Sequence, residues 1–445
     1  MRSMCVGQDI DRTYRPATGE FLKYIDKLSE STSLFVQKLV STPPDPILPA
    51  LDRQFLLTLR DFWRHIHQFV KPSRDADTLH SPVALIEQLE DHLSRLPGLD
   101  GVRLLISHTP ELNYFHFPRS VLRQRADDYA AIVPGSPDFP RKTAIIAIPY
   151  SQESSLFPNL IICHEMGHFV FEERKLADDL SPHIETALAT HFPAMMSDPD
   201  QELNLAWCRQ RLWSWAEEIY CDRFAIGLVG PAYSFAYIEL FDVIGAAEGN
   251  TVNHFFDTHP SDACRFSEHA AQLERGGWWP LLDRDGKSYA KLIRDMQQIP
   301  ATDYVFDSDE KADLATKVLT AFLDVNKNVA DLVNRTFNGL ETTFHGAIDL
   351  SCIDAVYNYL SWGVVPASLI HNKQVFKPEP TLLINAAYLF YLEMVPALMK
   401  RIKASRNERR DEVRQQEKWG QRVEQWTLKA LEDLRLPSRR KSWGS

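Results

Sequence analysis

The residues with the clearest potential for chemistry lie in the segment IICHEMGHFVFEE, which contains His164, Glu165 and His168 in the pattern HExxH. On a helix, positions i and i+4 project from the same face. Two imidazoles in that arrangement can bind one Zn²⁺ ion, and Glu165 is placed to take a proton from an attacking water. Pro158 upstream and the apolar residues around the motif favour a helix. The spacing therefore predicts a zinc site with a general base.

Zinc sites that catalyse hydrolysis usually have three protein ligands and an open fourth position. The residues after His168 read FVFEERKLADD, which lacks the Gly and His of HExxHxxGxxH and so excludes the metzincin arrangement. In the predicted helix 211–228, Glu218 and Asp222 stand four residues apart in apolar surroundings. We expect Glu218 to ligate zinc and Asp222 to accept a hydrogen bond from a ligating histidine. Glu217 is the nearest rival, but no carboxylate follows it four residues on.

HExxH followed by ExxxD on a later helix resembles the gluzincin class of zinc metallopeptidases. Within that class, EIYCDRFA at 218–225 is similar to the pattern E-x-x-(small)-D-x-x-A. A third segment, THPS at 258–261 with Arg265 five residues after the proline, resembles the T-H-P-(S/P)…R segment of peptidases of the HtpX and CAAX-prenyl-protease type. The resemblance covers roughly residues 100–275, and a soluble branch of the family is the better comparison.

The resemblance implies roles for two residues outside the helices that carry the ligands. His259 would donate a hydrogen bond to the developing oxyanion, and Arg265 would have a structural or substrate-orienting role near the cleft. A turn histidine before a proline is the competing interpretation of His259, and His254 in the same segment is an alternative donor.

A small sheet is expected just before the motif helix, because four short β-rich runs are punctuated there by prolines. They are VRLLIS (102–107), YFHF (114–117), DYAAIV (128–133) and TAIIAIPY (143–150). In the gluzincin class, a sheet-edge strand upstream of the motif commonly binds extended substrate by backbone pairing. The resemblance assigns that role here to the strand 144–148, through Ala144, Ile146 and Ile148.

The rest of the chain has the 3.6-residue apolar period of helices. The predicted fold class is α+β and mostly helical, a zincin-like metallopeptidase core with a small sheet. The predicted regions are an N-terminal helical region (1–98), a metallopeptidase domain (99–275) and a C-terminal helical domain with a basic tail (276–445). The apolar run 382–399 contains Asn385, Glu393 and Pro396, so it is predicted to be a buried helix rather than a membrane span.

Charge and cysteine content limit the partners and the compartment. The 445 residues include 60 acidic and 49 basic side chains, for a net charge of −11; residues 400–445 carry +7 and the remainder −18. Such an acidic body argues against nucleic-acid binding. Six scattered cysteines without a CxxC pair, and an N-terminus without a signal-peptide pattern, predict a cytoplasmic protein. The basic tail is interpreted as a solvated helix face.

These features predict a zinc-dependent metalloendopeptidase with one Zn²⁺ ion and a protein or peptide substrate. The helical flanks are candidates for gating, for a regulatory partner or for a homo-oligomer contact. One alternative is a latent or non-catalytic zinc-binding sensor or interaction protein. Another is an aminopeptidase, which is less favoured because the sequence has no GxMEN-type segment to capture a substrate amino terminus.

Overall fold

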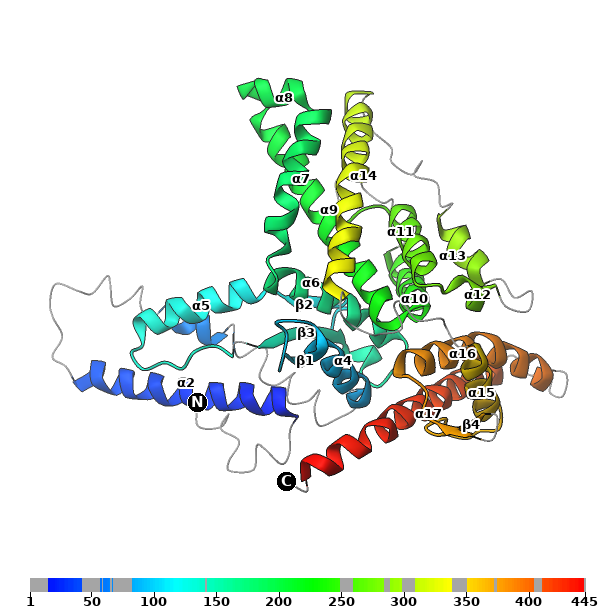
Figure 1. The fold of residues 1–445 in the computed structure, drawn as a ribbon. Coiled ribbons are helices and arrows are strands. Elements are labelled where there is room, and N and C mark those ends of the chain that lie inside the picture. The colour runs from blue at the N-terminus through cyan, green and yellow to red at the C-terminus, as the bar shows by residue number, and fades with distance from the viewer. Residues whose placement is uncertain are drawn as a thin grey trace. The chain divides into compact units, whose positions relative to one another are not determined.

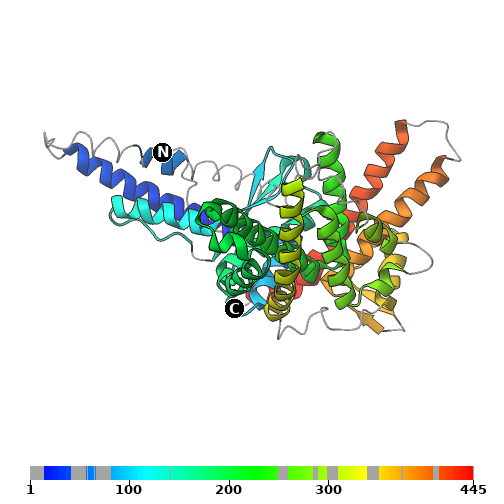
Figure 2. The same ribbon diagram turned by 90° about the horizontal axis from the view of Figure 1, so that it is seen from above.

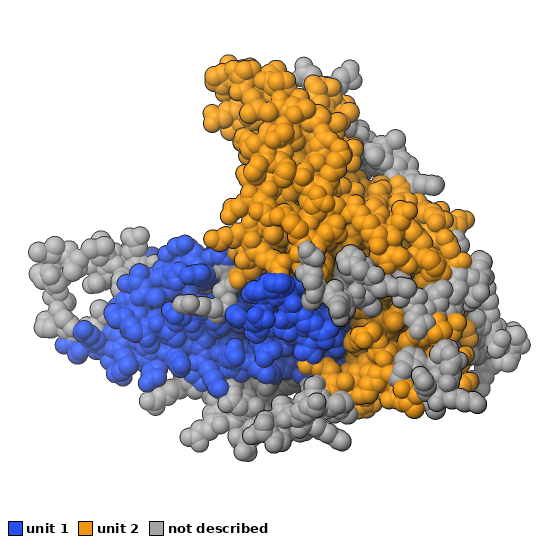
Figure 3. Space-filling model, in the orientation of Figure 1, with its two compact units in different colours: residues 1–154 blue, residues 155–445 orange. Residues whose placement is uncertain are grey.

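The computed structural model describes residues 15–41, 57, 59–64, 66, 82–140, 142–248, 259–283, 289–297, 309–337, 350–371, 374–403 and 410–443. His254 lies outside this range. The chain divides into two compact units, residues 1–154 and 155–445 (Figure 3). The structure confirms the predicted fold class to this extent: the protein is α+β, mostly helical, and has a small sheet.

The first unit contains the sheet and the helices that surround it, and residues 59–64 are also helical. Its elements in chain order are α2 (Pro16–Ser41), α4 (Val83–Arg95), β1 (Arg103–Thr109), β2 (Phe115–Phe117), α5 (Arg119–Ile132), β3 (Thr143–Pro149) and η1 (Tyr150–Gln152). Helices α2 and α4 lie in the region 1–98 that was predicted to be helical.

The sheet is mixed and has the strand order β1-β3-β2 (Figure 1). Strands β1 and β3 are parallel along their whole length, with Ile106 opposite Ile146, and β2 pairs antiparallel with β3 around Ile146. The edge position predicted for the substrate strand is therefore wrong, because β3 is the central strand. Ala144, Ile146 and Ile148 are buried. The backbone at Ile146 already has partner strands on both sides, so it cannot pair with a substrate peptide.

The strand predicted at 128–133 is also wrong, because this run is the end of helix α5. The helix begins directly after Pro118, which suits a helix start. Its buried residues Leu122, Ala126, Tyr129 and Val133 are spaced by four, three and four positions, which is a helical period. They pack with Phe21, Ile25 and Phe62 in one apolar core, which also takes Leu105 from β1 and Ile145 from β3.

The second unit contains the HExxH segment and is built almost entirely from helices. Its elements are η2 (Pro158–Ile161), α6 (Ile162–Glu173), α7 (Leu176–His191), α8 (Pro193–Ser197), η3 (Pro199–Gln201), α9 (Glu202–Val229), α10 (Pro231–Glu248), α11 (Asp262–Arg275), α12 (Trp279–Leu282), α13 (Tyr289–Gln297), α14 (Asp309–Phe337), α15 (Leu350–Ser361), β4 (Leu369–His371), β5 (Gln374–Phe376), α16 (Pro380–Lys403) and α17 (Arg410–Trp443). The antiparallel pair β4–β5 was not expected in a region predicted to be helical.

Helix α9 is the centre of this unit. It packs against α6, α7, α11 and α14, and the views in Figures 1 and 2 both show α7 and α14 running beside it. From Trp215 to Val229 it is buried on nearly every side. A helix that is apolar all round needs neighbours on all faces, and Glu218 and Asp222, which lie in this part of α9, are therefore held inside the protein.

Helix α16 contains the apolar run 382–399. Residues 382–390 are buried, and the helix packs on α9, α10, α15 and α17. The helix is confirmed, and its predicted burial is confirmed for residues 382–390, whereas residues 391–393 are half-buried and Met394 is exposed. Among the residues that the structure describes, no helix combines the length and hydropathy required to cross a bilayer.

Candidate metal centre

Helices α6 and α9 approach each other closely at Gly167. A Cβ atom at this position would lie 2.8 Å from the Cα of Cys221 on α9, which is closer than backbone atoms tolerate. Glycine at this crossing therefore permits the two helices to touch along their backbones. The contact brings the face of α6 that carries His164 and His168 against the carboxylates of α9.

Both motif histidines direct their Nε2 atoms at one carboxylate, as the ligand prediction requires. His164 Nε2 lies 3.3 Å from Glu218 Oε2, and His168 Nε2 lies 3.5 Å from Glu218 Oε1. Glu218 Oε2 is buried and has no hydrogen-bond partner of good geometry. The two imidazoles of α6 thus approach one carboxylate of α9, each at a different oxygen.

The other nitrogen of each imidazole is bonded to a carboxylate of its own. His164 Nδ1 lies 2.9 Å from Asp222 Oδ1, as predicted, and His168 Nδ1 lies 2.8 Å from Glu217 Oε1. Such bonds fix the tautomer that leaves Nε2 free to bind a metal. Glu217 was considered from the sequence only as a rival of Glu218, and this contact was not predicted, although two ligating histidines need two acceptors and Asp222 serves only one.

Asp222 is the most heavily bonded carboxylate of the centre. Arg265 binds it through two hydrogen bonds of 2.7 and 2.6 Å, and the Tyr233 hydroxyl donates to it at 2.5 Å. His269, which is fully buried, places Nε2 3.4 Å from its second oxygen. These contacts hold the pKa of Asp222 well below its usual range despite burial, so it remains an acceptor for His164. Tyr233 and His269 were not predicted.

The pKa values of the centre reflect its concentration of carboxylates. Burial favours neutral His164, but its hydrogen bond with Asp222 and the nearby carboxylates of Glu218 and Asp222 raise its pKa to about 10. Burial also opposes a charge on His168, whereas its bond to Glu217 and nearby carboxylates raise its pKa to about 9. Burial tends to raise the pKa of Glu218, but the two histidines lower it below the usual range. These carboxylates therefore stabilise positive charge beside them. Protons on the histidines supply that charge, and a bound divalent cation would supply it as well.

A second ligand set shares both histidines. His164, His168 and Cys221 offer ligand atoms that all lie within 4.8 Å of one another, so this group can hold a metal ion. Burial raises the pKa of the Cys221 thiol well above its usual value, which disfavours the thiolate that binds metals. Glu218 is already ionised and has an oxygen without a hydrogen bond. We therefore favour two imidazoles and this carboxylate, a donor set that suits zinc.

The remaining predicted residues divide between the two units. Glu165 is buried beside the histidines on α6, and Arg265 Nη2 lies 3.7 Å from Glu218 Oε2. His259 places Nε2 3.5 Å from Glu218 Oε1, with 52% of its side chain exposed. The structure thus brings all seven of the predicted catalytic, ligating and supporting residues together in the second unit. The predicted substrate residues Ala144, Ile146 and Ile148 belong to β3 of the first unit.

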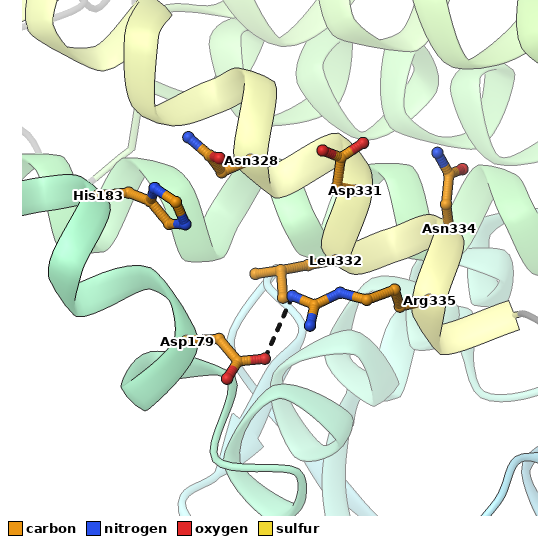
Figure 4. A pocket seen from close by; sticks show the side chains of 7 residues that line it. All are labelled: Asp179, His183, Asn328, Asp331, Leu332, Asn334 and Arg335. Atoms are coloured by element: carbon orange, nitrogen blue, oxygen red, sulfur yellow. Dashed lines mark ion pairs between the residues drawn. The ribbon is translucent and has the colours of Figure 1, made fainter.

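A separate pocket of about 450 Å³ lies between α7 and α14 and contains none of these residues (Figure 4). It is lined by Asp179, His183, Asn328, Asp331, Leu332, Asn334 and Arg335. Asp179 and Arg335 face each other across it in an ion pair of 3.2 Å. Six of its seven lining residues are polar or charged, and the HExxH motif lies outside the pocket.

Comparisons of the chain with protein-family models, with curated proteins and with solved structures find no match. The gluzincin resemblance therefore remains a prediction from the motifs, and the geometry described above is an independent argument for a metal site.

Proposed function

We propose that this protein is a zinc-dependent metalloendopeptidase with a zincin-like core, and that His164, His168 and Glu218 hold its single Zn²⁺ ion. The observation that carries the proposal is the convergence of both Nε2 atoms on Glu218, while Asp222 and Glu217 each bind one Nδ1 atom. This arrangement orients both imidazoles for one cation. The proposed substrate is a protein or peptide, and the proposed location is the cytoplasm.

The chain's own residues supply the proton transfers. When bound, zinc supplies a Lewis acid that polarises a peptide carbonyl and lowers the pKa of water. Glu165 takes a proton from the attacking water and returns it to the leaving amine. His259 donates a hydrogen bond to the oxygen on which negative charge develops. Arg265 keeps Asp222 ionised and in place behind His164.

Replacing Glu165 with glutamine tests this proposal. The Glu165→Gln variant should bind zinc stoichiometrically, because Glu165 is not a ligand, and should lose about 10²-fold or more of its peptide hydrolysis. Cleavage is measured on an unbiased peptide library with and without chelator, and zinc is measured by metal analysis. Glu173→Gln at the exposed end of the same helix is the control. Undiminished cleavage by Glu165→Gln would exclude the mechanism.

The burial of Glu165 supports a second candidate, a latent or non-catalytic zinc protein. Only 7% of this residue is exposed, so access of a peptide to the general base requires a change in the surrounding helices. The same library separates the alternatives. Internal cuts support the endopeptidase, removal of terminal residues supports an aminopeptidase, and bound zinc without cleavage supports the latent protein.

A further inference from the structure

The corner between α9 and α10 is held by a side chain from a distant part of the sequence. Helix α9 ends at Val229, Gly230 forms the turn, and α10 begins at Pro231. The Asn385 side chain of α16 accepts a hydrogen bond from Ala232 N (2.8 Å) and donates one to Val229 O (2.7 Å). One amide group thus binds the end of one helix and the start of the next.

Such bonds satisfy backbone groups that helix ends leave without partners. The Ala232 N–H belongs to the first turn of α10, and Val229 O belongs to the last turn of α9. Thr381, one turn before Asn385, donates to Leu228 O at 3.0 Å and so caps a second carbonyl of α9. Asn385 also donates to Thr381 O (2.8 Å), so each polar atom of its amide has a partner. A buried amide in an otherwise apolar helix requires such partners.

The corner has little freedom to adopt another conformation. Gly230 has φ 65° and ψ −151°, a conformation that only glycine adopts readily. A Cβ atom there would lie 2.7 Å from the Trp278 ring and 3.0 Å from Asn385 Nδ2. The turn is therefore enclosed by α16 on one side and by Trp278 on another.

Tyr233 follows this corner directly and reaches the metal centre. Its backbone N–H bonds to Gly230 O at 3.2 Å. Its hydroxyl donates to Asp222 at 2.5 Å and lies 3.2 Å from His164 Nδ1. The ring is fully buried and nearly parallel to the His164 imidazole, with the planes 5° apart. The position of this hydroxyl depends on the first turn of α10, and therefore on the corner.

We infer that Asn385 is a positioning residue for the metal centre: it fixes the α9–α10 corner, which fixes Tyr233 against Asp222 and His164. The inference rests on the proposed metal site. Helix α16 begins 149 residues after α10 does, and the inference makes it part of the structure that orients a ligating histidine.

The test measures zinc affinity by chelator competition in the full-length protein and the visible spectrum of its cobalt-substituted form. Asn385→Ala should weaken zinc binding about tenfold, the lower end of the range for residues that support metal ligands, and should change the cobalt spectrum. Leu383→Ala, a buried residue on the same helix, is the control for loss of stability alone. It should lower the unfolding midpoint and leave the spectrum unchanged.

A double-mutant cycle tests the route through Tyr233. Because Asn385 acts through this tyrosine, Asn385→Ala combined with Tyr233→Phe should weaken zinc binding no more than Tyr233→Phe alone. Two outcomes would overturn the inference. One is a double variant whose loss of zinc affinity equals the product of the two single losses, and the other is an equal loss of zinc affinity in Asn385→Ala and Leu383→Ala. If Asn385→Ala does not fold, Thr381→Val enters the same cycle. A wild-type protein that binds neither zinc nor cobalt refutes the proposed function and this inference with it, whereas normal binding by Asn385→Ala refutes only the inference.

Discussion

At the scale of single residues, the centre is defined by which carboxylate each histidine nitrogen faces. His168 is supported by Glu217 alone at Nδ1, whereas Asp222, which supports His164, is itself fixed by Arg265 and Tyr233. The two supports therefore differ in rigidity. Glu217 has no comparable network in the structure as described, and 38% of its side chain is exposed.

Glu217→Ala is predicted to weaken zinc binding about tenfold, because His168 loses the acceptor that orients its ring. Glu217→Gln should lose less, since the amide oxygen can still accept from Nδ1–H. Chelator competition on the two purified variants measures both effects. Equal affinities for wild type and Glu217→Ala would show that the 2.8 Å contact does not support the ligand.

The zinc content of two variants distinguishes Glu218 from Cys221 as the third ligand. Cys221→Ala should keep one zinc per chain, because a buried thiol with a raised pKa is a poor ligand. Glu218→Ala should reduce zinc binding strongly, because it removes the charge on which both Nε2 atoms converge. Metal analysis after gel filtration measures the stoichiometry. The reverse pattern would assign the site to the two histidines and the cysteine.

Most of this centre could be predicted from sequence because helical spacing is local. HExxH and ExxxD place their side chains on one face of their own helices, whatever the helices pack against. Tyr233 and His269 could not be found in this way. Their contacts with Asp222 depend on how α10 and α11 pack on α9, which no local pattern specifies.

At the scale of elements, the centre depends on the close crossing of α6 and α9. Gly167→Ala should destabilise the fold by about 1–3 kcal/mol, because the new methyl group meets the Cys221 backbone at 2.8 Å. Alanine otherwise favours a helix over glycine by about 1 kcal/mol, so the sign of the change tests the crossing.

Gly420→Ala on α17 is the matched control for that measurement. There the nearest atom is a ring carbon of Tyr391 at 2.9 Å, and a side chain can move where a backbone cannot. Urea unfolding of both variants gives the comparison. A Gly167→Ala protein as stable as wild type would contradict the tight crossing.

The elements that sequence predicted wrongly share a physical cause. DYAAIV is a short apolar run, and such runs fit a strand or a buried helix equally well. The longer window from Arg119 contains the helical spacing that decides between them. The position of β3 within its sheet could not be predicted at all, because strand order depends on pairing with distant segments rather than on the strand's own residues.

At the scale of the whole second unit, the C-terminal helices bind the backbone near both ligand-bearing helices. Asn385 holds the end of α9, and Glu424 of α17 accepts a hydrogen bond from Phe157 N (3.2 Å), shortly before α6. The Phe157 ring also packs against that of Tyr388 on α16, with the centroids 4.3 Å apart and the planes tilted by 43°. The sequence predicted α16 as a buried helix, but contacts between residues 153 to 267 positions apart follow only from the packed structure.

The Glu424 contact gives the unit a predicted dependence on pH. Burial, partly offset by hydrogen bonds from the backbone of Phe157 and Leu156, raises the pKa of Glu424 from its ordinary value of 4.5 to about 7, and the charge of Glu239 on α10 adds to the rise. Tyr388 and Tyr391 face the same carboxyl from α16. Between pH 4.5 and 7 the folded state therefore binds more protons than the unfolded state, so the free energy of unfolding falls as pH rises.

Glu424→Gln should remove this part of the pH dependence, because the amide accepts the same backbone hydrogen bond and does not ionise. At pH 4 the variant should match wild type, and at pH 8 it should be more stable by on the order of 2 kcal/mol, since one pKa unit corresponds to about 1.4 kcal/mol and this side chain is partly exposed. Urea unfolding at both pH values measures the difference. Glu432→Gln, an exposed position on the same helix, should follow wild type. If Glu424→Gln and wild type have the same free energy of unfolding at pH 8, ionisation of Glu424 does not destabilise the folded protein. The contact between α17 and Phe157 would then contribute nothing to the pH dependence of stability.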